Sequence, residues 1–331
     1  MKDRKKDHIH LALDSQIPQD LKDRRFDYEP LYSPHPDEYP PVEFLGKKLR
    51  MPIWVSSMTG GTVQAGTINH NLAQACREFG TGMGLGSCRI IMEDDSYFKD
   101  FDVRSIIGDD LPLYANLGVA QIEKTLASGE IDRVRILLDK LQADGLIVHV
   151  NPLQEWMQPE GDRYRVPPLD TIGELIQKAD FPVIVKEVGQ GMGPESLKTL
   201  MKLLLEAIEL AAFGGTNFIR MELRRDNTGE KNLLAPLSFV GHDAEEMTRM
   251  VNHIVDTETD IQCRQLIISG GIQTFLDGYY LINLSKIPAI YGQASSLLKY
   301  ACRDYESLHV YLSRQLEGLK LAQAYLRIKE N

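Results

Sequence analysis

The segment from His149 to Asp162 holds the densest group of chemically capable side chains in this sequence. It places an imidazole, amides and carboxylates directly after residues 145–150, an apolar run that is typical of a buried strand. Enzymes with parallel strands build their active sites from polar groups at the carboxyl ends of those strands. A hydrogen-bonded core histidine and a solvated turn would explain single residues here, whereas the cluster as a whole favours a site.

Two other strand patterns carry polar residues at the same relative position as the strand that ends near His149. The two-residue period of strands places Tyr114 with Asn116, His149 with Asn151, and Ile184 with Lys186 on shared faces. A buried ammonium is costly without an anionic or electron-rich partner. The neighbouring Glu187 could be a purely structural partner for Lys186, and a bound ligand is the alternative.

Glycine-rich segments follow several of the same apolar runs. They occupy residues 56–61, 82–89, 213–216, 269–272 and 292–295. Glycine-rich exits of two consecutive late strands are the phosphate site common in barrel enzymes. Arg89 is the last residue of the segment 82–89, and its planar guanidinium could bind phosphate oxygens through two parallel hydrogen bonds. The alternative interpretation is an arginine on a solvated loop.

The alternation of short apolar runs with longer segments of helical period predicts repeated βα units. Eight such units predict a closed (β/α)8 TIM barrel with an N-terminal extension and a C-terminal helix. We expect residues 1–50 to form an arm that wraps the barrel and clamps the substrate, and residues 51–331 to form the barrel with its C-terminal helix. The expected strands are 53–57, 82–85, 113–117, 145–150, 183–187, 217–223, 265–269 and 289–291, and the expected helices are 65–79, 96–101, 132–142, 170–178, 194–212, 243–257, 275–284, 297–301 and 305–329.

Composition narrows the class of protein. A chain of 331 residues that is 43% hydrophobic can bury a large core. Its net charge of -10 argues against a nucleic-acid partner. The charged N-terminus lacks an apolar leader and no run is long enough to cross a membrane, so we expect a cytoplasmic protein. The four cysteines lie far apart, which indicates neither a zinc site nor a disulfide framework.

Eight motifs, in this order, resemble those of the type 2 isopentenyl diphosphate isomerases, which are FMN-dependent barrel enzymes. The motifs are Arg4-Lys5-x-Asp7-His8, Met58-Thr-Gly-Gly61, Gly84-Leu-Gly-Ser-x-Arg89, Ala115-Asn-Leu-Gly118, His149-x-Asn-Pro-Leu-Gln-Glu155, Pro159-Glu-Gly-Asp162, Lys186-Glu-Val-Gly189 and Gly214-Gly-Thr216. The resemblance implies reversible isomerisation of isopentenyl diphosphate to dimethylallyl diphosphate. It also implies reduced FMN as acid/base cofactor, NADPH as flavin reductant, Mg²⁺, and a tetrameric or octameric homo-oligomer.

The resemblance also implies roles for individual residues. The flavin would contact Met58, Thr59, Gly60, Ser87, Asn116, Lys186 and Thr216, with its phosphate on Gly270, Gly271, Gln293 and Ala294. The substrate diphosphate would contact Arg4, Lys5, His8, Ser87 and Arg89. Asn151 and the catalytic candidates His149 and Gln154 would lie near the reacting carbons, Lys186 would stabilise charge on the reduced flavin, and Glu155 would bind Mg²⁺. Residues 224–240 could close as a lid.

The chain departs from the family pattern mostly in its last third. Phe218 stands where the family usually has Trp, and Cys88 where it usually has Gln; the other departures are at His242-Asp-Ala244, Tyr280 and Ser285-Lys286. Cys88 at a strand end raises the alternative of a cysteine nucleophile. Two further alternatives are an FMN-dependent 2-hydroxy-acid oxidoreductase, which would need a histidine base beside an arginine clamp, and a degenerate barrel that only binds flavin.

Overall fold

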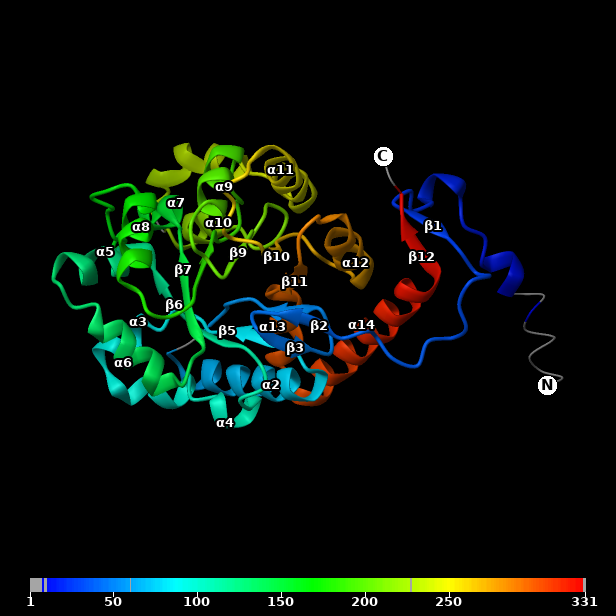
Figure 1. Ribbon diagram of the computed structural model, residues 1–331, viewed down its shortest axis with the longest axis horizontal. Helices are drawn as coiled ribbons and strands as arrows, with labels where there is room; N and C mark the ends of the chain where they lie inside the picture. The colour runs from blue at the N-terminus through cyan, green and yellow to red at the C-terminus, as the bar shows by residue number, and fades with distance from the viewer. Residues whose placement is uncertain (1–7, 9–10, 60, 227, 330–331) are drawn as a thin grey trace.

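Eight parallel strands close into a barrel in the computed structural model, which describes residues 8, 11–59, 61–226 and 228–329. Each strand pairs with the next along the chain, and the last pairs with the first (Figure 1). This confirms the predicted (β/α)8 barrel. The barrel strands are β4 (Ile53–Val55), β5 (Gly82–Gly84), β6 (Leu113–Gly118), β7 (Gly145–His149), β8 (Val183–Lys186), β9 (Ala207–Glu209), β10 (Leu266–Ser269) and β11 (Ala289–Gln293).

Helices surround the barrel, and several of them, such as α2, begin at a residue whose side chain caps the helix. Thr62 accepts a hydrogen bond from the Ala65 amide at the start of α2, and Gly80 ends that helix in the left-handed conformation. The longer α-helices are α2 (Val63–Phe79), α5 (Val119–Ala127), α6 (Asp132–Leu141), α8 (Pro168–Lys178), α9 (Pro194–Met201), α10 (Phe218–Arg225), α11 (Ala244–Thr257), α12 (Phe275–Leu284) and α14 (Tyr305–Tyr325). The shorter α-helices are α3 (Arg89–Glu93), α4 (Arg104–Ile107), α7 (Pro152–Met157) and α13 (Ser295–Ala301), and the segments of 3-10 helix are η1 (Gln19–Leu21), η2 (Asp95–Asp100) and η3 (Glu230–Phe239).

The sixth strand lies earlier in the chain than predicted. Residues 217–223 were expected as a strand, but Asn217 caps α10 by accepting a hydrogen bond from the Arg220 amide, and Ile219 and Glu222 face inward. The strand is β9 instead, within the predicted helix 194–212, which ends at Met201. Buried Glu209 interrupts the apolar run of β9 and gave that segment a helical pattern. The correction places the glycines of 213–216 after the sixth strand.

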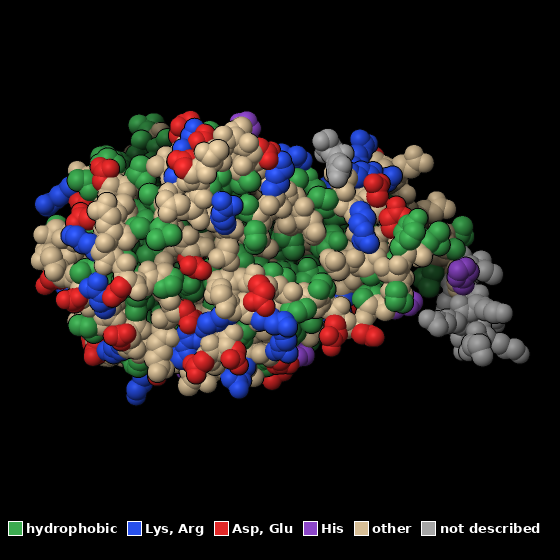
Figure 2. Space-filling view, in the orientation of Figure 1, with side chains coloured by type: hydrophobic (Ala, Val, Ile, Leu, Met, Phe, Trp, Pro, Cys, Tyr) green, Lys and Arg blue, Asp and Glu red, His purple; other side chains and the backbone are tan. Residues whose placement is uncertain are grey.

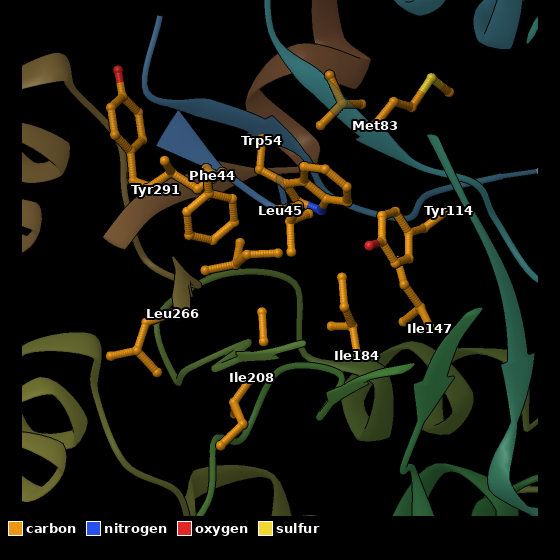
Figure 3. Packing of buried hydrophobic residues seen from close by; sticks show 14 of the residues in the cluster. Phe44, Leu45, Trp54, Met83, Tyr114, Ile147, Ile184, Ile208, Leu266 and Tyr291 are labelled. Atoms are coloured by element: carbon orange, nitrogen blue, oxygen red, sulfur yellow. The ribbon is translucent and has the colours of Figure 1, made fainter. Parts of the chain in front are cut away.

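The N-terminal region contributes two separate pieces to the fold. The hairpin of β2 (Val42–Phe44) and β3 (Lys47–Leu49) turns at Leu45 and Gly46, both with positive φ, which is the turn that suits a twisted hairpin. The Leu45 amide donates to Gln265 Oε1, just before β10. Figure 3 shows Phe44 and Leu45 among side chains of the barrel strands, including Trp54 and Tyr114. The hairpin therefore closes the amino end of the barrel.

The second piece lies beyond the barrel. The predicted helix 305–329 ends at Tyr325, and β12 (Leu326–Ile328) follows it. β12 pairs antiparallel with β1 (Phe26–Tyr28) at the far end of α14 (Figure 1). This pairing ended the helix early, and its partner is too distant in sequence for a local pattern to reveal it.

The surface mixes charges of both signs. On the face shown in Figure 2, Lys and Arg side chains alternate with Asp and Glu side chains, so the net negative charge is not gathered into one patch there. Within the described ranges, none of the helices has the length and apolar character needed to cross a membrane.

Candidate active site

The carboxyl ends of all eight barrel strands meet at one mouth, where most of the predicted site residues lie. Asn116, His149, Lys186 and Gln293 belong to the strands themselves, and Gly270 and Gly271 follow β10 directly. Arg4, Lys5 and Gly60 lie outside the described residues. His8 belongs to the segment before β1, and Figure 1 shows that segment at the end of α14 away from the barrel rather than at this mouth.

Asn116 and His149 form a fixed pair on neighbouring strands. Asn116 Nδ2 donates to the Leu85 carbonyl at 3.1 Å. Its Oδ1 therefore faces His149 Nδ1 at 2.8 Å, so that ring nitrogen must carry the proton and donate. Burial, and then the charge of Lys186, lower the pKa of His149 to about 3. A neutral imidazole with an unprotonated Nε2 results, and Gly118 leaves room for it because a Cβ there would lie 3.0 Å from Nε2.

Lys186 is a buried cation beside a buried carboxylate. Its Nζ donates to the Glu187 carbonyl at 3.0 Å, and burial lowers its pKa while the charge of Glu209 opposes that shift. The side chain of Glu187 turns elsewhere, because its Oε2 accepts the amides of Gly189 and Gln190, both at 2.6 Å. The expected structural partner thus supplies a backbone oxygen rather than its carboxylate.

Glu209 was not among the predicted site residues, because β9 was read as helix. It pairs in register with Lys186 and is 1% exposed. The Ser269 hydroxyl donates to Glu209 Oε1 at 3.0 Å, while Glu209 Oε2 has no hydrogen-bond partner in the described part of the chain. A carboxylate inside an otherwise apolar run was the signal that could have identified it.

The first turn of α7 assembles three of the predicted residues. Asn151 Nδ2 lies 3.1 Å from both Gln154 Oε1 and Glu155 Oε1. Tyr164 donates its hydroxyl to Asn151 Oδ1 at 2.9 Å, which fixes the orientation of the amide. The other Glu155 oxygen accepts the Asp162 amide at 2.7 Å. These contacts hold Gln154 and Glu155 at the mouth beside His149.

Arg89 extends from the start of α3 toward the same loop. Its guanidinium lies 3.2 Å from Glu93 and 3.5 Å from Asp162, and half of the side chain is exposed. Ser87 is exposed next to it. The structure thus leaves both predicted diphosphate contacts accessible at the end of β5.

Cys88 lies between these two residues but is buried. Its Sγ donates to the Gly86 carbonyl at 3.3 Å, and burial raises its pKa to about 12. A nucleophilic cysteine needs an accessible thiolate, so this environment counts against the alternative of a cysteine nucleophile.

The glycine segments after β9 and β10 approach each other closely. Gly270 and Gly271 have φ of +94° and +72°, in the region that favours glycine. A Cβ at Gly270 would lie 2.1 Å from the Ala212 oxygen, and one at Gly214 would lie 3.1 Å from Gly271 Cα. Consecutive glycines in this conformation leave backbone amides accessible to an anion. Thr216 is exposed beside this cradle, and Met58, Thr59 and Ala294 are half-buried at neighbouring strand ends.

Unpartnered polar atoms lie next to that cradle. Gln293 Nε2 and Ser56 Oγ are buried without hydrogen-bond partners among the residues described. Tyr311 of α14 donates to Gln293 Oε1 at 3.2 Å, which directs the Nε2 donor away from α14. Buried polar groups are rarely left unpaired, so these atoms indicate a place for a polar ligand.

A metal ion at Glu155 would need ligands other than protein side chains. Across the described ranges, no group of three or more His, Cys, Asp or Glu side chains could hold a metal ion by itself, so Glu155 would need oxygens from a ligand or water.

A cavity of about 320 Å³ opens between α7 and the loop after β8. Its lining includes Asn151 and Gln154 together with the apolar Leu153, Met192 and Phe218.

Comparisons with known proteins separate sequence likeness from fold likeness. No protein-family model matches the chain. An isopentenyl-diphosphate delta-isomerase of Rickettsia typhi is 36% identical over 306 residues, which cover 90% of this chain and 86% of that protein. A flavocytochrome b2 mutant with pyruvate bound superposes with a TM-score of 0.63 at 14% identity, covering 90% of this chain and 71% of the other. A mandelate oxidase mutant with a monooxide FMN adduct superposes with a TM-score of 0.56 at 14% identity, covering 93% and 88%. The two structures show the barrel fold, and the relative in sequence indicates the activity.

Proposed function

Because the chain belongs to the isopentenyl-diphosphate delta-isomerase family and is an isomerase, we propose that it interconverts isopentenyl diphosphate and dimethylallyl diphosphate. The reaction would use reduced FMN and Mg²⁺, and NADPH would reduce the flavin. The observation that carries the proposal is the 36% identity over 90% of the chain to a relative of that name. The polar cluster at the barrel mouth supports it.

The residues at the mouth fit a flavin phosphate. Gly214, Gly270 and Gly271 let two loops approach so closely that Cβ atoms would meet the neighbouring backbone, and glycines in this conformation leave backbone amides accessible. Gln293 Nε2 and Ser56 Oγ are donors without partners among the described residues. A mandelate oxidase of the same fold carries an FMN adduct. We therefore assign the phosphate to these residues together with Ala294, and the ring to Met58, Thr59, Gly60, Ser87, Asn116, Lys186 and Thr216.

Moving the double bond adds a proton to one carbon of the substrate and removes a proton from another. When bound, reduced FMN would supply this acid/base chemistry. The chain would bind and orient the reacting groups. Gln154 would place the hydrocarbon chain of the substrate or relay a proton. Neutral His149 would present its unprotonated Nε2 to the substrate. Buried Lys186 would stabilise negative charge on the reduced flavin.

The diphosphate would lie at the rim, near α3 and α7. Arg89 and Ser87 are accessible there, and Glu155 is within one helical turn of Asn151. Mg²⁺ is usually held by one or two carboxylates plus phosphate oxygens, so a single Glu155 fits this role. Because the segment that holds His8 lies away from this mouth in its own chain, Arg4, Lys5 and His8 of the arm would complete the anion site of a neighbouring subunit.

Residues 224–240 would act as a lid over this site. They include η3, whose Lys231 contacts the Met157 carbonyl of α7. Leu233 and Phe239 are largely exposed on η3 and could cover an apolar substrate chain on closure.

We further propose a cytoplasmic homo-oligomer, tetrameric or octameric, which light scattering during size-exclusion chromatography would test.

The test of the proposed function uses purified full-length protein with FMN, NADPH, Mg²⁺ and isopentenyl diphosphate in D₂O without oxygen. We expect dimethylallyl diphosphate that carries deuterium. Bleaching of the flavin by a 2-hydroxy acid with no isomer formed would favour the oxidoreductase. Flavin binding without either reaction would favour the degenerate barrel, and both results would refute the isomerase.

A further inference from the structure

The Pro159-Glu-Gly-Asp162 motif has no role in the function proposed above, yet it contacts the site on two sides. Its main chain passes so close to α7 that a Cβ at Gly161 would lie 1.9 Å from the Glu155 carbonyl oxygen. Arg163 then donates to that same carbonyl at 2.7 Å and lies over the Trp156 ring at 4.6 Å. The motif is thus folded tightly onto the helix that carries Glu155.

Asp162 contributes both its main chain and its side chain to this arrangement. Its amide donates to Glu155 Oε2 at 2.7 Å. Its carboxylate, only 17% exposed, lies 2.5 Å from Lys124 Nζ on α5 and 3.5 Å from Arg89 Nη1 at the start of α3. One residue therefore connects the proposed metal ligand with the proposed diphosphate ligand.

Lys124 is the anchor of that connection. The Lys124 contact is the shorter of the two, and α5 is packed on the barrel through buried Val119, Ile122 and Leu126. Arg89 is instead shared between Glu93 and Asp162. The ion pair with Lys124 holds the Asp162 side chain against α5, and this restricts the direction of the Asp162 backbone amide. Because that amide donates to Glu155 Oε2, the Glu155 carboxylate is held in place as well.

We propose that Asp162, anchored by Lys124, is a positioning residue that orients Glu155 toward a metal-bound diphosphate. The proposal rests on the function proposed above for Glu155. Groups that orient a metal ligand typically change metal affinity about 10–100-fold when removed. Asp162→Asn keeps the shape of the side chain and removes the charge that Lys124 holds, and Lys124→Met removes the anchor from the other side.

The experiment measures Mg²⁺-dependent binding of inorganic pyrophosphate to the full chain by calorimetry. We expect either substitution to weaken this binding about tenfold and to speed trypsin cleavage after Arg163. The kcat at saturating Mg²⁺ and substrate should change less than about twofold, because the contact orients a ligand and does not take part in the reaction. The double variant should bind no more weakly than the single variants, because the two side chains act as one unit.

Lys178→Met is the matched control, because it breaks a lysine–carboxylate pair of 2.6 Å with Glu174 on α8 that touches no predicted site residue. It should leave binding and cleavage unchanged. Unchanged pyrophosphate binding in Asp162→Asn and Lys124→Met would overturn the inference, even if cleavage became faster. A wild-type protein that binds Mg²⁺ and pyrophosphate but does not isomerise would refute the proposed function and leave this inference standing.

Discussion

Replacing His149 with Gln should remove part of the protein's sensitivity to acid. Burial and the charge of Lys186 hold the pKa of His149 at about 3 in the folded protein, whereas an unfolded histidine takes up a proton near pH 6.5. Between these values the unfolded chain binds more protons than the folded one. The free energy of unfolding must therefore fall as the pH falls from about 6.5 toward 3.

The size of this effect follows from the same two pKa values. From pH 7 to pH 5, a group with these values lowers the free energy of unfolding by about 2 kcal/mol. His149 is only part-buried at the barrel mouth, so water reduces the cost of charging it. We therefore expect His149 to account for about 1 to 2 kcal/mol of the loss over this range.

Urea unfolding of the flavin-free protein at pH 7, 6 and 5 would measure this contribution. His149→Gln should lose about 1 to 2 kcal/mol less than the wild type between the two extremes. His253→Gln, on the exposed side of α11, is the matched control and should follow the wild type. Equal losses in the wild type and His149→Gln would show that the histidine is not held neutral, and the reasoning from its burial would be wrong.

Three further predictions concern the proposed cofactor sites. Glu155→Gln should raise the Mg²⁺ concentration needed for half-maximal isomerisation and leave FMN bound; a loss of flavin absorbance would argue against a metal role. Gly270→Ala should lower the melting temperature strongly because its Cβ would lie 2.1 Å from a backbone oxygen, whereas Gly173→Ala in α8 meets open space and should not; equal shifts would contradict this. Tyr311→Phe should weaken FMN binding about fivefold through loss of one hydrogen bond to Gln293, and an unchanged dissociation constant by equilibrium dialysis would contradict it.

The sequence was sufficient to predict the closed barrel and the mouth at which its polar residues meet. Seven of the eight strands lie where apolar runs of the right length stand between segments of helical period. The period of two along strands predicted that Asn116 and His149 lie on polar faces at the strand ends, whereas the hydrogen bond between them was not predicted. Local periodicity was the determining signal in these cases.

The rest depends on contacts between distant parts of the chain. β9 was missed because buried Glu209 interrupts its apolar run, and the contacts that accommodate this carboxylate come from Lys186 on β8 and Ser269 on β10. The end of α14 was misplaced because β12 has its partner near the other end of the sequence. Neither Tyr311 nor Lys124 has a local pattern that indicates its contact with Gln293 or Asp162. Such residues are recognisable only once the strands and helices are placed in three dimensions.

The pairing of β1 with β12 bears on the order in which the protein is made. β1 is synthesised early, but among the described residues it pairs only with β12, which leaves the ribosome almost a whole chain later. The barrel strands, by contrast, each find a partner in the next unit as it is translated. The segment that leads into β1 therefore reaches its final place only after the barrel mouth has formed. A truncation before β12 would leave a nearly complete barrel in which β1 has lost its strand partner and keeps only its side-chain contacts with α12, such as the ion pair of Arg25 with Asp277.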